Sequence, residues 1–326
     1  MRFLAFAVLL ACLVTPCSAA QRGAGAQARG ALGSWAELSG AWDGTGTDAA
    51  GAYTMHANVE TLFGGQYVLI QARETRGDKT HDNVTVFTGG EAPGAYIYGE
   101  GVPHIHLNGT VDAENGQVIA NDAKLYISWG RGEGGTLTGY REEADADGNL
   151  NPVAKWELKR TSPTASPTSS PNSAPSNHRG TVEYFEFMDG TLKGEGLQAK
   201  VPGQMAADHF VITQVNAGVL NDTLLLTRET KTFDGGRVDE SLQIHQVQNG
   251  APVRHDFTSR GNVLEYGGVF NDIAQMRLNI DVPAGKLQIA VVATCSGFKT
   301  VNDLTRPGRP PVWVGEMQIK KVGHGK

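Results

Sequence analysis

The chain has 326 residues, 42 of them glycine, and a formal net charge of −6. The charge is uneven, because residues 34–160 carry 18 acidic and 9 basic side chains, whereas residues 179–326 carry 16 of each. An acidic first half argues against nucleic acids and anionic membranes as partners, since both repel negative charge.

Residues 1–20 have the pattern of an export signal. Arg2 precedes an apolar run over residues 3–14 that is too short to span a bilayer, and small residues near Ala19 suit cleavage. A lipoprotein signal ending at Cys12 is the alternative. No later run is apolar enough to span a membrane as a helix. We therefore expect a secreted protein, extracellular or periplasmic, with a flexible arm over residues 21–33.

The sequence repeats itself at a distance of 150 to 161 residues. The matching segments are Gly40–Gly46 with Gly190–Gly196, Leu69–Thr75 with Leu224–Thr230, and Lys155–Arg160 with Glu316–Lys321. A Pro/Ser/Thr-rich segment over residues 161–178 separates the copies and is too polar to form a core. The repeat predicts two tandem domains, over residues 34–160 and 179–326.

Within each copy, apolar and polar residues alternate with a period of two, and glycine-rich turn signals recur about every 8–12 residues. This pattern predicts an all-β protein with two tandem antiparallel up-and-down β-barrels of about eight to ten strands each. A helical turn over residues 34–38 is expected to plug one end of the first barrel, and Ser34 and Glu37 have the spacing of a capping box.

The segment Leu38–Gly46, which contains a Gly-x-Trp at Gly40–Trp42, resembles the opening of lipocalin-like (calycin-type) barrels. The continuation through Phe63–Leu69 and Arg73-Glu74 is similar to secreted lipocalin-like and, distantly, nitrobindin-like domains. The resemblance implies that Trp42 packs beneath the barrel floor and that the interior binds a small, mainly apolar molecule. Nitrobindin-type barrels hold haem through a late histidine. The first copy has no histidine after His106, so we predict no haem and no other cofactor.

The repeated dipeptides Arg73-Glu74 and Arg228-Glu229 are the candidate ligand-binding residues. Neighbours on a strand face opposite sides, so one member of each pair enters the barrel, but apolar residues on both sides leave open which one. An inward charge would anchor a polar group of the ligand, and the alternative is a ring of salt bridges at the barrel rim. Tyr96 and Tyr98 are expected at the barrel mouth.

His104 and His106 lie on one face of a predicted strand, which is a spacing compatible with a metal ion. Zinc needs three or four ligands, and the sequence does not show whether His56 or His81 lies near enough to contribute. The alternative is a pair of surface or barrel-mouth histidines.

Three further motifs have less distinctive patterns. Residues 143–150 resemble the first half of a calcium loop, but Ala154 stands where the bidentate glutamate belongs, so an acidic hairpin tip is expected. Asn83, Asn108 and Asn221 fit the N-glycosylation pattern, which matters only in a eukaryotic source. Cys295 is alone after signal removal and is expected to be a small buried residue of a strand.

No nucleophile motif, phosphate loop or dinucleotide fingerprint is present, so no catalytic residue is predicted. The sequence favours a secreted tandem-barrel protein that binds a small, mainly apolar molecule, with the first copy expected to carry the activity. An isomerase-like or cyclase-like barrel enzyme and a non-catalytic interaction module are the alternatives. The oligomeric state is left open.

Overall fold

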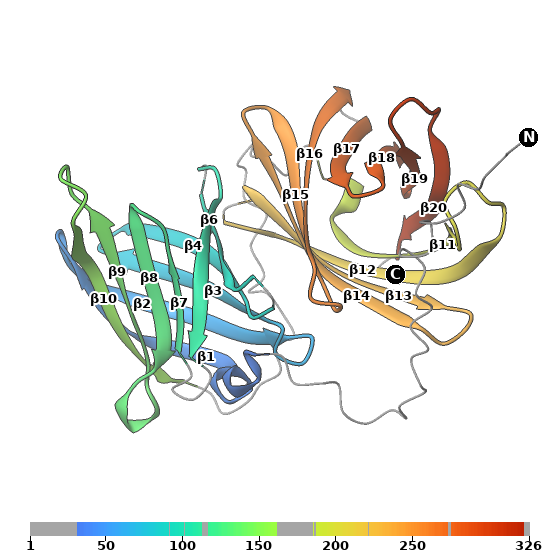
Figure 1. Cartoon of the computed structure of the whole chain (residues 1–326). Helices are drawn as coiled ribbons and strands as arrows, with labels where there is room; N and C mark the ends of the chain where they lie inside the picture. The colour runs from blue at the N-terminus through green and yellow to red at the C-terminus, as the bar shows by residue number, and fades with distance from the viewer. Residues whose placement is uncertain are drawn as a thin grey trace, which may run out of the picture.

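The computed structural model describes residues 31–90, 92–100, 102–112, 117–161, 185, 187–220, 222–272 and 275–322. The predicted signal, nearly all of the arm and linker, and Asn221 lie outside these ranges. Two closed antiparallel ten-stranded barrels follow each other along the chain, which confirms the predicted fold class (Figure 1). Within the described part, no helix is long and apolar enough to cross a membrane.

The first barrel is a meander in which each strand pairs with its neighbour in sequence and β1 closes on β10. Its strands are β1 Gly40–Asp48, β2 Gly51–Leu62, β3 Tyr67–Arg76, β4 Lys79–Thr88, β5 Gly94–Gly99, β6 Ile105–Asp112, β7 Gln117–Asn121, β8 Leu125–Arg131, β9 Leu137–Ala144 and β10 Leu150–Arg160. A short 3₁₀ turn, η2 Glu133–Gly135, joins β8 to β9. Side chains of alternating residues fill the interior, as Tyr53, Met55 and Ala57 of β2 do.

The second barrel repeats this order, and β11 closes on β20. Its strands are β11 Gly190–Ala199, β12 Ala207–Val219, β13 Leu224–Phe233, β14 Val238–Gln248, β15 Ala251–Thr258, β16 Val263–Asp272, β17 Gln275–Val282, β18 Gly285–Thr294, β19 Gly297–Thr305 and β20 Val312–Lys321. β18 ends one residue before Cys295, which is exposed in the following turn, so the prediction of a buried cysteine is wrong. The apolar run before it had suggested a strand that continues through this position.

The repeated glycines mark the place where each barrel closes. A Cβ on Gly44 would lie 2.1 Å from the backbone oxygen of Glu157, and a Cβ on Gly194 would lie 1.9 Å from that of Gln318. Glu157 and Gln318 belong to the last strand of their barrels. At both closures the first strand therefore approaches the last too closely for any side chain at these two positions.

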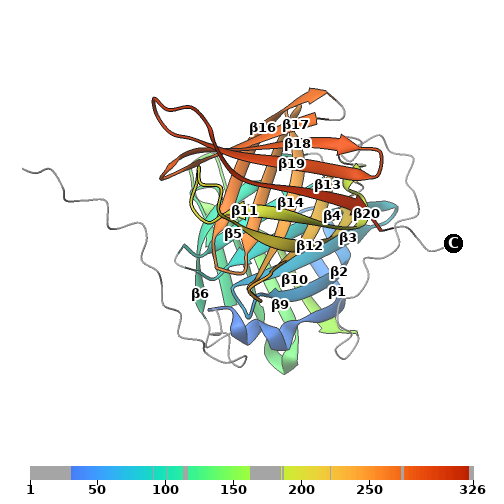
Figure 2. The same cartoon turned by 90° about the vertical axis from the view of Figure 1, so that its right-hand side faces the viewer.

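A 3₁₀ turn, η1 Gly33–Leu38, covers one end of the first barrel, coloured blue at its lower end in Figure 2. Trp35 and Leu38 are buried in the barrel core, and the Trp42 indole donates a hydrogen bond of 2.8 Å to the backbone oxygen of Leu38. The guanidinium of Arg160, on the last strand, stacks 4.7 Å above the Trp42 ring. The expected helical turn is present, but no side-chain capping hydrogen bond forms at its start.

The barrels pack side by side along a seam formed by the outer faces of β3–β5 and β13–β15 (Figure 1). The seam is a continuous apolar cluster, whose fully buried members include Leu69, Val86, Tyr98, Leu224 and Phe257. These strands are therefore apolar on their outward side, which explains why β3 and β13 show no clean alternation in sequence.

Polar contacts also tie the two barrels at the edges of the seam. Arg228 forms a bidentate ion pair with Glu60, with Nη1 2.8 Å from one carboxylate oxygen. Further contacts are Tyr67 Oη to the backbone oxygen of Asn262 at 3.0 Å, Gln66 Nε2 to that of Ser259 at 3.0 Å, Gln246 Nε2 to that of Val102 at 2.7 Å, and Gln248 Nε2 to Nδ1 of His104 at 2.7 Å.

Candidate functional sites

The larger of the two barrel cavities is in the second barrel and has a volume of about 630 Å³. It opens at the end of the barrel where β13 turns into β14 and β15 into β16. One wall, from β13–β15, is polar and charged, and the other, from β16–β20, is largely apolar. The apolar wall consists mainly of Leu264, Tyr266, Leu287, Ile289, Leu304 and Met317.

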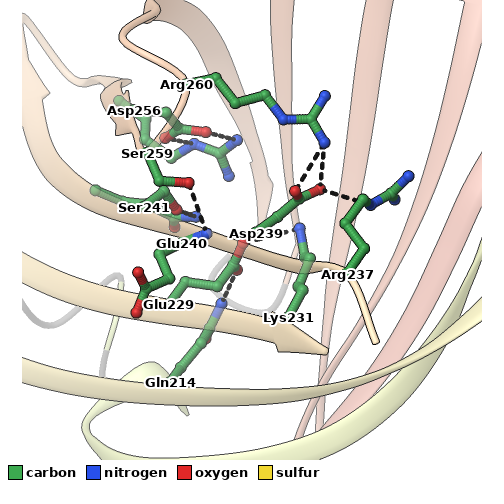
Figure 3. A network of polar contacts seen from close by, with 12 residues as sticks. Gln214, Glu229, Lys231, Arg237, Asp239, Glu240, Ser241, Asp256, Ser259 and Arg260 are labelled. Carbon is green, nitrogen blue, oxygen red and sulfur yellow. Dashed lines mark hydrogen bonds and ion pairs between the residues drawn. The ribbon is translucent and has the colours of Figure 1, made fainter. Parts of the chain in front are cut away.

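The wall of β13–β15 is polar because these strands pack against the first barrel. Since β13–β15 turn their apolar residues outward against the first barrel, their polar residues face inward. Glu229 is buried there, and each of its carboxylate oxygens has a partner: Lys231 Nζ at 2.8 Å and Gln214 Nε2 at 2.7 Å (Figure 3). Burial alone would raise the pKa of Glu229, but the Lys231 ammonium and the Gln214 amide hold it below its ordinary value. The carboxylate is therefore charged and fixed in position at neutral pH.

A second buried pair lies on β15 in the same wall. Arg254 Nη2 donates to Asp256 Oδ2 at 2.9 Å, and its Nε lies 2.8 Å from Oδ1 without hydrogen-bond alignment. The guanidinium also stacks 4.2 Å above the ring of Tyr266. Burial raises the pKa of Asp256 to about 6, although Arg254 opposes the shift. A desolvated ion pair of this kind is unfavourable in an apolar core. Its position beside the cavity therefore marks the cavity as a candidate functional site.

Two oxygens on the far side of the cavity lack partners. Thr300 and Asn302 of β19 line it, and among the described residues neither Thr300 Oγ1 nor Asn302 Oδ1 accepts or donates a hydrogen bond, although both atoms are buried. An unpaired buried oxygen is destabilising by about 1–3 kcal/mol. A hydroxyl or amino group of a bound molecule would satisfy them.

Charged residues surround the mouth of this cavity. Asp239 accepts two hydrogen bonds from Arg260, at 2.7 and 2.9 Å, and lies 3.5 Å from Nε of Arg237 (Figure 3). Ser259 Oγ accepts a hydrogen bond of 3.2 Å from the backbone N–H of Glu240. These contacts fix the two loops that border the opening.

The first barrel has a smaller cavity, about 220 Å³, at its open end. Aromatic side chains fill much of the interior, and the rings of Trp129 and Trp156 lie 4.8 Å apart beside this space. Glu74 lines the cavity, and burial raises its pKa. The duplicated glutamates thus face inward in both barrels, but only Glu229 lies directly against a cation.

The arginines of the two dipeptides face outward, where the strand alternation places them. Arg73 forms a bidentate pair with Asp82, with bonds of 2.7 and 2.8 Å, on the outer face of the first barrel. Arg228 pairs with Glu60 across the seam. Neither arginine lines the cavity of its barrel. This position differs from the ligand-anchoring role predicted for them and is closer to the salt-bridge alternative.

The two tyrosines expected at the barrel mouth, Tyr96 and Tyr98, belong to the apolar cluster between the barrels. Tyr96 packs against Phe257 of the second barrel, with ring centres 5.3 Å apart, and Tyr98 packs against His255 at 5.7 Å. Tyr98 also borders the small cavity of the first barrel. Both tyrosines are thus mainly part of the seam.

The two histidines of the predicted metal pair, His104 and His106, have different contacts. His106 stacks on Tyr96, with ring centres 4.3 Å apart, while His104 reaches the second barrel and contacts His255, also at 4.3 Å. Neither His56 nor His81 joins them: His56 bonds Asp43 at 2.5 Å, and His81 borders the small cavity. The acidic loop is a hairpin tip in which Asp145 accepts hydrogen bonds from the backbone of Asp147 and Asn149.

Arg254 and Asp256 were not identified from the sequence. In the segment Val253–Phe257, strand alternation puts Arg254 and Asp256 on one face and Val253, His255 and Phe257 on the other, but the pattern alone does not show which face is the interior. The interior assignment needs the seam, which covers the apolar side.

Comparisons with known proteins do not identify a family for this chain. No protein-family model matches the chain, and neither does any curated protein. Among solved structures it is similar to a DUF3598-family protein of unknown function from Nostoc punctiforme PCC 73102, with 11% identity, 91% of this chain and 100% of that chain covered, and a TM-score of 0.28. Another is a "putative outer membrane protein" from Bacteroides fragilis NCTC 9343, with 9% identity, 88% and 99% covered, and a TM-score of 0.22. Both scores are too low to carry an argument.

Proposed function

We propose that this protein is a secreted small-molecule binder and that its ligand occupies the second barrel. The observation that carries the proposal is the 630 Å³ cavity, in which buried charged pairs face an apolar wall. Ligand sites are typically apolar concavities with a few fixed polar groups. The resemblance of the first copy to lipocalin-like barrels and the signal-like N-terminus support the same function.

The two walls define the class of ligand. Leu287, Ile289 and Leu304 suit an apolar body, while the oxygens of Thr300 and Asn302 need hydrogen-bond donors. Glu229 and Asp256 are already paired with Lys231 and Arg254, so neither carboxylate is a free charge for the ligand. We therefore propose a compact amphiphile with hydroxyl or amino groups, which is more polar than the mainly apolar molecule expected from the sequence.

The first barrel is assigned a supporting role in this proposal. Its interior is packed with tryptophans and leaves a cavity about one-third as large as that of the second barrel. Its outer face covers the strands that carry the polar wall. This assignment differs from the expectation that the first copy holds the activity.

Native mass spectrometry with a panel of small hydroxylated and aminated amphiphiles tests the proposal. Ile289→Trp places a larger ring in the proposed site, and Ile127→Trp does the same in the small cavity of the first barrel. We expect at least one compound to bind one-to-one to the wild type and to Ile127→Trp, and to be lost in Ile289→Trp.

Two results would contradict the proposal. One is a complete lack of binding across the panel by correctly folded protein. The other is binding that survives Ile289→Trp but disappears in Ile127→Trp, which would assign the site to the first barrel.

A further inference from the structure

The seam brings together three potential metal ligands from both barrels. His104 lies between β5 and β6 of the first barrel, while His255 of β15 and Glu265 of β16 are directly opposite each other in the second. One ligand atom from each lies within 4.8 Å of the others. Two of the three are imidazoles, so this group is not simply an acidic patch.

His255 is the central member of the group. Its ring is buried, and within the described residues its Nε2 forms no hydrogen bond, although Glu265 Oε2 lies 3.6 Å away. The ring packs against Tyr96, Tyr98 and His104, which fixes its plane. Buried polar atoms are normally hydrogen-bonded, so a buried His255 Nε2 that lies 3.6 Å from a carboxylate oxygen without a hydrogen bond calls for a further partner.

His104 and Glu265 complete the two sides of the group. The side-chain amide nitrogen of Gln248 lies 2.7 Å from Nδ1 of His104 and donates a hydrogen bond to it, and the ring centres of His104 and His255 are 4.3 Å apart. A neutral His104 ring that accepts at Nδ1 carries its proton on Nε2, so metal binding requires Gln248 to release Nδ1 or to turn its amide oxygen toward it. The Glu265 side chain is 58% exposed, which gives an ion a route in from solvent and leaves the carboxylate free to adjust.

We propose that His104, His255 and Glu265 bind a divalent transition-metal ion of the Zn²⁺ class across the seam. Two imidazoles and a carboxylate are a preferred donor set for such ions, with water in the fourth position. Ligand atoms about 2.0–2.2 Å from a tetrahedral zinc lie about 3.4 Å from each other. The His255–Glu265 distance is close to that value, so a side-chain adjustment would bring all three into range.

The site would link the two barrels, since one ligand comes from the first and two come from the second. It uses His104 but not His106, whose ring is stacked on Tyr96. The inference is independent of the small-molecule site, because none of the three residues lines the cavity of the second barrel.

Calorimetric titration of the metal-free full chain with Zn²⁺ tests the proposal, with Co²⁺ absorption as a spectroscopic readout. We expect one equivalent of Zn²⁺ to bind, and His104→Gln and Glu265→Gln each to weaken the affinity by at least about tenfold. Both residues are accessible enough to change without removing a core side chain. His209→Gln and His56→Gln, at exposed histidines bonded to Asp234 and Asp43, are the controls and should keep wild-type affinity.

The Co²⁺ form should show the visible absorption of a four-coordinate ion in the wild type and in both controls, but not in His104→Gln. The proposal is overturned if folded wild-type protein binds no Zn²⁺. It is also overturned if His104→Gln and Glu265→Gln leave the affinity unchanged, or if a control variant weakens it as much as they do.

Discussion

Glu229 and Glu74 occupy equivalent positions in the two copies and face the interior of their barrels, but their surroundings differ. Glu229 is held by Lys231 and Gln214, and its pKa is lowered, whereas Glu74 is desolvated and its pKa is raised. Ionisation of Glu229 therefore stabilises the folded protein, whereas ionisation of Glu74 destabilises it. The free energy of unfolding should report this difference as a function of pH.

We expect Glu229→Gln to destabilise the protein by about 1–3 kcal/mol at pH 7, because Lys231 loses its charged partner. A lowered folded-state pKa contributes stability above the unfolded-state value, about 4.3, and loses it as the pH falls through the folded-state pKa. The deficit of this variant should therefore shrink in acid. Urea unfolding at pH 7 and at successively lower pH measures it, and a deficit that is independent of pH would contradict the assignment.

Glu74→Gln should have the opposite sign. A raised folded-state pKa means that ionisation of Glu74 opposes folding, so removing the charge is expected to stabilise the protein at pH 7. The advantage should vanish as the pH falls below about 4.3, where the wild-type carboxyl is protonated in both states. The same unfolding series tests it, with the exposed Glu157→Gln as a control that should change little.

The sequence identified the dipeptides Arg73-Glu74 and Arg228-Glu229 but did not show which side chain of each pair faces the barrel interior. Leu224 and Leu226 lie on the side of Arg228, and Leu225 lies on the side of Glu229, so apolarity did not distinguish inside from outside. The reason is physical, because strands buried on both faces lose the alternation on which such predictions rest.

At the scale of the elements, barrel closure depends on the repeated glycines. We expect Gly44→Ala and Gly194→Ala each to destabilise the protein by about 1–3 kcal/mol, because the added Cβ meets the backbone of the last strand. Gly267→Ala, in a strand where nothing lies within 4 Å of the added Cβ, is the matched control. The midpoints of thermal unfolding of the three variants measure the effect. Equal midpoints would show that close contact between the first and last strands does not require glycine at these two positions.

The floor of the first barrel gives a second prediction at this scale. Trp35 is fully buried in η1 and packs against Phe87, with ring centres 6.4 Å apart. Its replacement by alanine should reduce the free energy of unfolding by about 3–5 kcal/mol, whereas Trp35→Phe should retain most of it. If Trp35→Ala unfolds like the wild type in guanidinium, η1 is not a structural part of the barrel.

The elements were the most predictable level of this molecule. Alternation, turn spacing and the repeat together predicted two meanders that close, since each of these signals is local in sequence. Cys295 is an example of a failed local prediction, because an apolar run in the sequence does not show at which residue the strand ends. The Ser34 capping box fails similarly: the 3₁₀ turn forms through packing of Trp35, without a side-chain cap.

For the whole molecule, the seam is the feature that the sequence left undetermined. A polar linker suggested independent domains, yet the outer faces of β3–β5 and β13–β15 share one apolar cluster. Long-range packing between copies has no periodic signature. In the sequence the seam is visible as apolar residues on both faces of β3 and β13. Taken alone, this pattern left open which side chains point into the barrel.

The seam should make the barrels unfold as one unit. Leu224→Glu buries a carboxylate between them without altering the interior of the second barrel, because Leu224 faces outward. We expect calorimetry to resolve two transitions in this variant and one in the wild type, and small-angle scattering to show a larger radius of gyration. Val211→Glu, at an exposed position of β12, should retain wild-type behaviour. Identical profiles for all three proteins would contradict a cooperative seam.

Methyl-resolved NMR of the full chain with an added amphiphile shows which barrel holds the ligand. Isoleucine and leucine methyl groups report on both interiors: Ile289, Leu287 and Leu304 in the second barrel, Ile127 and Leu125 in the first. Saturable shifts confined to the first three are the predicted result. Shifts confined to Ile127 and Leu125, or scattered over surface methyl groups, would contradict it.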